Sequence, residues 1–226
     1  MAVGAVLNID HFIGDDQRKI AEARAQAEGR WVDRKATGTG PTDRIHFETP
    51  PNGGIVNPKR EHLKVGQYYF RFVSKSISHK DKVAGQWWVE FDTLNNIYGR
   101  FKAAGANEAV KYQGAHPDSS PRSSVREWLA LTFDWNEIEQ ITVAQLWARM
   151  DAYTGFGRLA KGPDGKHVGD NRAFGYAPHL SNMFSVKQLY VPGMWELHEK
   201  AFPKPVFFDF SDIDRLIAGE LSSQFA

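Results

Sequence analysis

The chain has 226 residues, of which 42% are hydrophobic and 24% are charged, so it can bury a sizeable core as one domain. Its 28 Lys and Arg residues balance 27 Asp and Glu residues, which excludes a global electrostatic attraction to nucleic acid or to an anionic membrane. The sequence contains no cysteine, and this excludes disulfides, thiolate nucleophiles and cysteine metal sites.

The first residues, MAVGAVLNIDHF, lack the basic start and the apolar run of a cleavable signal peptide. No segment is apolar for long enough to cross a membrane. We therefore expect a soluble protein that stays in the cytoplasm or is delivered into a target cell without a cleaved signal.

Residues 1–65 are expected to form an N-terminal extension. Between Asp15 and Trp31 apolar residues recur at helical spacing among many charges, which predicts one surface helix with the stripe Ile20, Ala23, Ala27 and Trp31. Between Thr37 and Pro58 the chain is rich in Gly, Pro, Thr and Asn, a composition typical of a linker. We expect residues 66–226 to fold as a domain without this extension.

The first half of this domain predicts two strands and a helix. QYYFRFVS at 67–74 is dense in aromatic and β-branched residues and predicts a strand, and QWWVEFD after Gly85 predicts the next. A helix is expected to follow, with its apolar face formed by Leu94, Ile97, Tyr98 and Phe101. Residues 106–124 are expected to form a loop, and WLALTFDW at 128–135 a further strand.

The second half predicts more short elements. Ile141 to Met150 fits either a helix or a strand, and we favour a strand. Tyr153 to Ser181 is long, polar and rich in glycine, which indicates a binding loop. A strand FSVKQLYVPG, a helix MWELHEKAF, a strand PVFFDF and a last helix follow, with Ser211 and Asp214 spaced as a capping box. This order of elements favours an α+β domain with a short-stranded sheet.

Three positions are unusual for the strands that contain them. Arg71 is the one charge in a strand with two apolar faces, so it needs a carboxylate, backbone carbonyls or an anionic ligand unless it reaches solvent. Trp87 and Trp88 point to opposite faces, so one enters the core and the other packs under a helix or stacks on a heteroaromatic ring. Gln188 can hydrogen-bond a neighbouring strand or a sugar hydroxyl.

Other motifs of catalysis are missing from the sequence, among them phosphate-binding loops, dinucleotide fingerprints, GxSxG and HExxH. The eight histidines are scattered singly, so we expect no metal site. An RNA-cleaving toxin that uses scattered His and Lys has no residue spacing in its favour.

Short motifs along the chain resemble those of the ADP-ribosyltransferase-like superfamily, in particular its NAD-glycohydrolase toxin branch. The matching segments, in chain order, are Arg71-Phe72, Gly85-Gln86-Trp87-Trp88, Arg100 in the following helix, and Gln188-Leu189-Tyr190-Val191-Pro192. Together they span roughly residues 66–195. In that branch the late glutamine stands where the transferases have a catalytic glutamate.

The resemblance implies an ADP-ribosyltransferase-like α+β fold, with a split, short-stranded sheet, peripheral helices and the N-terminal extension. It implies NAD as the substrate and cleavage of its nicotinamide N-glycosidic bond, by hydrolysis or by transfer of ADP-ribose, without a metal. The implied site residues are Arg71 and Arg100 on the diphosphate, Trp87 or Trp88 on the nicotinamide, Gln188 on the ribose, and Phe72 and Tyr190 beside them. Arg71 and Gln188 are implied to act in catalysis and should converge on one cleft.

A toxin or effector of this kind would meet an inhibitor or immunity protein, or a delivery apparatus that residues 1–65 contact. The alternative is a non-enzymatic binding or virion-type structural protein whose aromatic residues form the core. Release of nicotinamide from NAD separates the two hypotheses.

Overall fold

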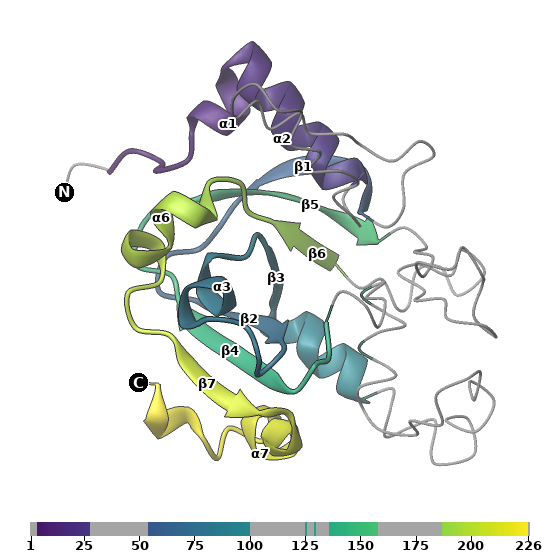
Figure 1. Cartoon of the computed structure of the whole chain (residues 1–226), viewed down its shortest axis with the longest axis vertical. Helices are drawn as coiled ribbons and strands as arrows, with labels where there is room; N and C mark the ends of the chain where they lie inside the picture. The colour runs from purple at the N-terminus through teal and green to yellow at the C-terminus, as the bar shows by residue number, and fades with distance from the viewer. Residues whose placement is uncertain are drawn as a thin grey trace, which may run out of the picture.

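The computed structural model describes residues 4–27, 54–99, 125, 129, 136–157 and 187–225. Their strands form one seven-stranded antiparallel sheet in the order β1-β5-β6-β3-β2-β4-β7, which confirms a mixed α+β class (Figure 1). The strands are β1 Ile55–His62, β2 Tyr68–Val73, β3 Trp87–Glu90, β4 Gln140–Gln145, β5 Asp151–Gly157, β6 Lys187–Tyr190 and β7 Val206–Asp209.

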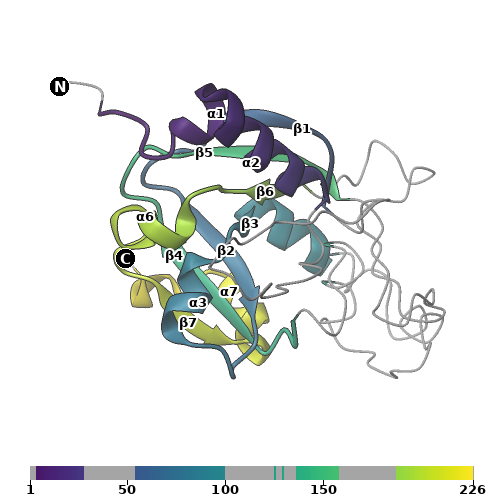
Figure 2. The same ribbon diagram turned by 45° about the horizontal axis from the view of Figure 1, so that its top comes forward.

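Helices lie on both sides of this sheet. They are α1 Asp10–Ile13, α2 Asp15–Ala27, α3 His79–Ala84, α6 Met194–Ala201, α7 Ile213–Ile217 and a helix through residues 91–99, with short 3-10 turns at Phe210–Asp212 and Ser222–Gln224. Helices α1 and α2 lie along β1 and β5 at one end of the sheet, and α7 lies beside β7 at the other (Figures 1 and 2). None of the helices in these ranges is long and apolar enough to span a membrane.

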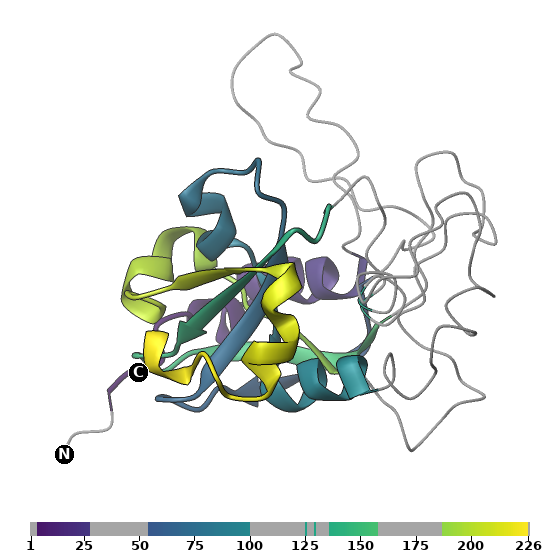
Figure 3. The same ribbon diagram turned by 90° about the horizontal axis from the view of Figure 1, so that it is seen from below.

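Alternation along β2 separates two faces of the sheet, which we name the Phe70 face and the Tyr69 face. On the Phe70 face lie α7 and the helix of residues 91–99 (Figure 3). The core between this face and the helices contains Phe70, Phe72, Val89, Ile141, Val143 and Phe208 from the strands and Leu94, Ile97, Ile213 and Leu216 from the helices. The Tyr69 face packs on α6 and buries Tyr69, Trp88, Ala144, Leu189, Met194, Ala201 and Phe202. Both faces are therefore covered, which is why β2 reads as apolar on its two sides.

The linker expected between Thr37 and Pro58 is wrong at residues 55–58, because residues 55–62 of the expected extension belong to the sheet. These residues form the edge strand β1, which pairs with β5 from Ile55 opposite Gly157 to His62 opposite Asp151. The ladder shifts between Val56 and Lys59, where Asn57 has a φ of 49°. The Asn and Pro that indicated a linker are tolerated because an edge strand can accommodate a bulge and a missing donor.

Residues 4–27 contain two helices where one was expected, and these helices bury a different stripe from the expected one. Ala21 and Ala25 are buried with Phe12 against Ile55, Tyr153 and Tyr190, whereas Ile20 is 36% exposed. The physical reason is size, because Ala allows the backbone of α2 to approach the sheet closely. The carbonyl of Gln26, for example, would lie 2.5 Å from a Cβ on Gly54.

Most expectations for the later elements are confirmed, including strands at 68–73, 87–90, 140–145, 187–190 and 206–209 and the helix α6. Three of the expectations for the later elements are wrong. Leu129 is helical, although 128–135 was expected to be a strand. Residues 153–157 continue β5 instead of opening a loop. The N-cap of α7 is Asp212 and makes no side-chain capping bond, so the capping box is not formed. The expected loops at 106–124 and 158–181 lie outside the described residues.

Candidate functional site

The three strands that carry the sequence motifs are neighbours in the sheet, in the order β6-β3-β2. Trp87 pairs with Tyr190 and Trp88 pairs with Leu189 between β3 and β6. Phe70 pairs with Val89 between β2 and β3. The register therefore decides which motif side chains share a face.

The register places Arg71 and Gln188 on opposite faces of the sheet. Residues that pair directly share a face, so Gln188, Tyr190, Trp87 and Phe72 belong to the Phe70 face. Arg71 and Trp88 belong to the Tyr69 face. The expected convergence of Arg71 and Gln188 on one cleft is therefore wrong, because alternation sends the two side chains to opposite sides of the sheet. Arg100 lies outside the described residues.

Arg71 binds the C-terminal end of α3. Its Nη1 donates to the carbonyls of Asp81 at 2.5 Å and Lys82 at 3.1 Å, two of the acceptors that a helix end leaves open. Desolvation lowers the pKa of Arg71 to about 10, while the nearby Asp81 acts to raise it, so the guanidinium stays charged at neutral pH. Backbone carbonyls are thus the partners of this cation among the described residues.

Gly85 makes this arrangement possible. A Cβ at Gly85 would lie 1.8 Å from Cζ and 2.0 Å from both Nη atoms of Arg71. The glycine ahead of the two tryptophans is therefore required by a steric contact with Arg71. Trp88 uses the same residue, since its Nε1 donates to the Gly85 carbonyl at 2.7 Å.

The two tryptophans have different surroundings. Trp88 is 1% exposed and lies 4.5 Å from Phe202 between ring centroids, so it is a core residue. Trp87 is half-buried and meets the fully buried Tyr190 edge to face, at 5.1 Å between centroids. Phe72 is buried against Phe210. Of the aromatic residues implied for NAD, Trp87 alone keeps partial exposure.

Gln188 has one end anchored and the other available. It is 6% exposed, and its Nε2 donates to the carbonyl of Leu129 at 2.8 Å. No described residue donates to its Oε1. The amide orientation is therefore set by the Leu129 carbonyl, which leaves the acceptor end of Gln188 on the Phe70 face, two residues from Tyr190.

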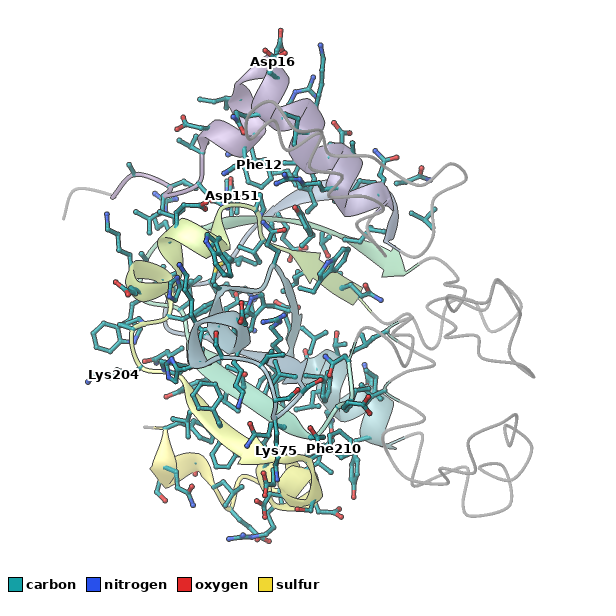
Figure 4. The ribbon with its side chains drawn as sticks, viewed as in Figure 1. Phe12, Asp16, Lys75, Asp151, Lys204 and Phe210 are labelled. Carbon is teal, nitrogen blue, oxygen red and sulfur yellow. The ribbon has the colours of Figure 1, made fainter. Side chains whose placement is uncertain are left out.

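A polar cluster that the sequence patterns did not reveal surrounds Asp151, near α1 (Figure 4). The Asp151 side chain is 1% exposed and binds Arg60 and His62 on β1. Asn8 binds its backbone, accepting from Asp151 N at 2.9 Å and donating to Asp151 O at 2.8 Å. Arg60 and His62 fall in the segment expected to be an N-terminal extension, and their alternation indicates a shared face only if that segment is a strand.

No protein-family model, curated protein or solved structure matches the chain. Among the described ranges, no group of three or more His, Asp or Glu side chains is arranged to hold a metal ion. The candidate site is therefore defined by its own geometry: Gln188, whose Oε1 accepts from none of the described residues, Trp87 with a partly exposed ring, and Tyr190 supporting that ring.

Proposed function

We propose that the protein is an NAD-consuming enzyme with an ADP-ribosyltransferase-like split sheet, acting as an NAD glycohydrolase or an ADP-ribosyltransferase. One observation carries the proposal: Gln188 and Tyr190 of β6 share a face with Trp87 of the adjacent β3. An amide acceptor and a partly exposed indole on neighbouring strands match what a ribose bearing a flat nicotinamide ring requires.

In this proposal Oε1 of Gln188 accepts a hydrogen bond from a ribose hydroxyl. Its dipole faces the positive charge that develops on the ribose as the N-glycosidic bond breaks. Because Nε2 is held by the Leu129 carbonyl, the oxygen is preoriented. Trp87 packs against the nicotinamide and Tyr190 fixes the indole. A neutral amide stabilises a cation less than a carboxylate does, so positioning supplies much of the rate.

Arg71 has a different role from the one the resemblance implies. It lies on the opposite face and binds Asp81 and Lys82. We assign it to positioning: it fixes α3 and Gly85, and so the entry to β3. Arg100 stays the candidate for the diphosphate of NAD.

Nicotinamide release from NAD by the purified protein is the direct test. We expect Gln188→Ala to lower kcat by about tenfold to a hundredfold, since a preoriented hydrogen bond to the transition state is worth about 1–3 kcal/mol. Trp87→Ala should mainly raise KM, whereas Trp195→Ala, at an exposed residue of α6, should leave both constants unchanged. Gln188→Glu should increase turnover or permit transfer to protein.

The nicotinamide assay can also contradict the proposal. If the wild-type protein at micromolar concentration releases no nicotinamide and labels no protein in a cell lysate, the proposal fails.

The alternative, a non-enzymatic binding or virion-type structural protein, has one observation in its favour. Gln188 and Arg71 both make hydrogen bonds that serve the fold itself. A protein of this kind would release no nicotinamide, and Gln188→Ala would change its melting temperature alone.

A further inference from the structure

A buried carboxylate holds an arginine and a histidine side chain at the edge strand β1. Oδ1 of Asp151 lies 2.6 Å from Nδ1 of His62, and Oδ2 accepts from Nε of Arg60 at 2.6 Å, with Nη2 of Arg60 at 2.5 Å. The Asp151 side chain is 1% exposed, while those of Arg60 and His62 are 36% and 69% exposed. The acid is thus internal and its partners face solvent.

The carboxylate is fixed from behind. Asn8, itself 2% exposed, binds both backbone polar groups of Asp151 and also donates to the carbonyl of Pro192 at 3.0 Å. The backbone of Asp151 therefore cannot move without breaking the contacts of the N-terminal segment, and its side chain presents a stationary acceptor to His62.

This contact determines which nitrogen of His62 is free. A carboxylate accepts, so Nδ1 carries a proton, and in the neutral imidazole it is Nε2 that keeps the lone pair. No described residue binds Nε2. A nitrogen nucleophile oriented by an internal acid and exposed to solvent is the arrangement that covalent catalysis and side-chain modification use.

Arg60 supplies a second group next to this nucleophile. Arg60 and His62 are two residues apart on β1 and share a face, since both reach the same carboxylate. Nε and Nη2 of Arg60 bind Asp151, whereas Nη1 donates to no described residue. A guanidinium with a spare donor is suited to the oxygens of a phosphoryl group.

We propose that Arg60, His62 and Asp151 form a phosphoryl-accepting site in which Nε2 of His62 is the acceptor atom. The lone pair of Nε2 attacks the phosphorus of a small phosphoryl donor, an N–P bond forms, and the bond to the leaving group breaks with its electron pair. Nδ1 keeps its proton, and the positive charge left on the ring lies against Asp151. Arg60 stabilises the transferred oxygens. The site is independent of the proposed NAD chemistry.

The other described histidines lack this arrangement. His79 is exposed but packs edge to face on Phe207, at 5.0 Å between centroids, and makes no ion pair. His11 and His198 are partly buried and likewise have no carboxylate at a ring nitrogen within the ranges that the structure describes. His79 therefore serves as a matched, exposed control.

The test uses phosphoramidate as the donor on the full-length chain, with ammonia as the leaving group. Peptide mapping and ³¹P NMR should find phosphorylation at Nε2 of His62 at least about tenfold faster than at His79. The variant His62→Gln should lose the fast phase, and His79→Gln should keep it. Asp151→Asn should slow the phosphorylation of His62. Arg60→Lys keeps the positive charge and removes the guanidinium fork, so it separates the effect of the fork geometry from the effect of the charge.

Two results would overturn the proposal: equal rates at His62 and His79, or a fast phase that survives His62→Gln. Thermal melts of every variant show whether it is folded. If Asp151→Asn does not fold, His62→Gln and Arg60→Lys still decide the question, because neither removes the internal carboxylate.

Discussion

Gly85 and Arg71 show how a single residue without a side chain can determine where a charge goes. Gly85 has an ordinary φ of −65°, so alanine is compatible with its backbone. The obstacle is steric, because a Cβ would overlap the Arg71 guanidinium at 1.8 Å. The guanidinium would have to leave the carbonyls of α3.

We therefore expect Gly85→Ala to lower the free energy of unfolding by about 1–3 kcal/mol, the range for overpacking a filled site. Urea unfolding measures this change. Gly99→Ala is the matched control: its Cβ would meet nothing within 4 Å, and helix propensity favours alanine by up to about 1 kcal/mol. In the double variant with Arg71→Met, the effect of Gly85→Ala should shrink, since the clashing group is gone. Simple additivity would contradict the clash.

The same residues show what a sequence can reveal about a site. The apolar faces of β2 correctly indicate that Arg71 needs partners, and backbone carbonyls are one of the kinds of partner that the sequence predicts. Sequence could not choose among them, because the choice depends on α3 folding back over β2. Alternation did predict that Trp87 and Trp88 separate. The relative face of Arg71 and Gln188 depends on the register across β3, which short motifs do not encode.

At the scale of elements, Asn8 joins the N-terminal segment to the sheet through three hydrogen bonds to the backbone of Asp151 and Pro192. We expect Asn8→Ala to destabilise the protein by about 1–3 kcal/mol, since buried backbone groups lose their partners. Asn8→Asp should be at least as damaging, because a carboxylate cannot donate to the two carbonyls. Thermal melts compare the variants, and an unchanged midpoint for Asn8→Ala would show that this link contributes nothing.

The docking of α1 should weaken in acid because of His11. Burial lowers the pKa of His11; Glu196 and Asp10 act against this shift, and Arg24 acts with it. The folded state therefore favours neutral His11, and its contribution is present above the unfolded pKa of 6.5 and is lost as the pH falls below it. Melting temperatures of wild type and His11→Gln, measured from pH 8 to pH 5, should converge as the pH falls. Parallel curves would contradict the assignment.

Element prediction succeeded where the pattern was dense and failed where the environment overrode it. β2, β3 and α6 carry strong local patterns and were located within a few residues. β1 was missed because Asn57 and Pro58 are strand breakers except at a bulged edge. α2 was located with the wrong buried stripe, since close packing on the sheet favoured Ala21 and Ala25 over Ile20.

At the scale of the whole molecule, the domain boundary at residue 66 can be tested by two truncations. The fragment 54–226 keeps β1 and loses α1 and α2, so it uncovers Tyr153 and Tyr190. The fragment 66–226 also loses β1, which turns β5 into an edge strand and removes Arg60 and His62 from the buried Asp151. The second truncation thus breaks the ladder between β1 and β5, and it also leaves the buried Asp151 carboxylate without Arg60 and His62.

We expect stability to fall in two steps, and the second to be the larger, because removing the partners of a buried carboxylate costs about 3–5 kcal/mol. An exposed β5 edge should also make the fragment 66–226 self-associate, while 54–226 keeps the charged edge strand that prevents pairing. Thermal melts and size-exclusion chromatography measure both effects. The fragment 66–226 could match the full-length protein in melting temperature and in association state only if the sheet needed neither β1 nor the Asp151 cluster. A monomeric 66–226 that melts at the midpoint of the full-length protein would therefore support a domain boundary at residue 66.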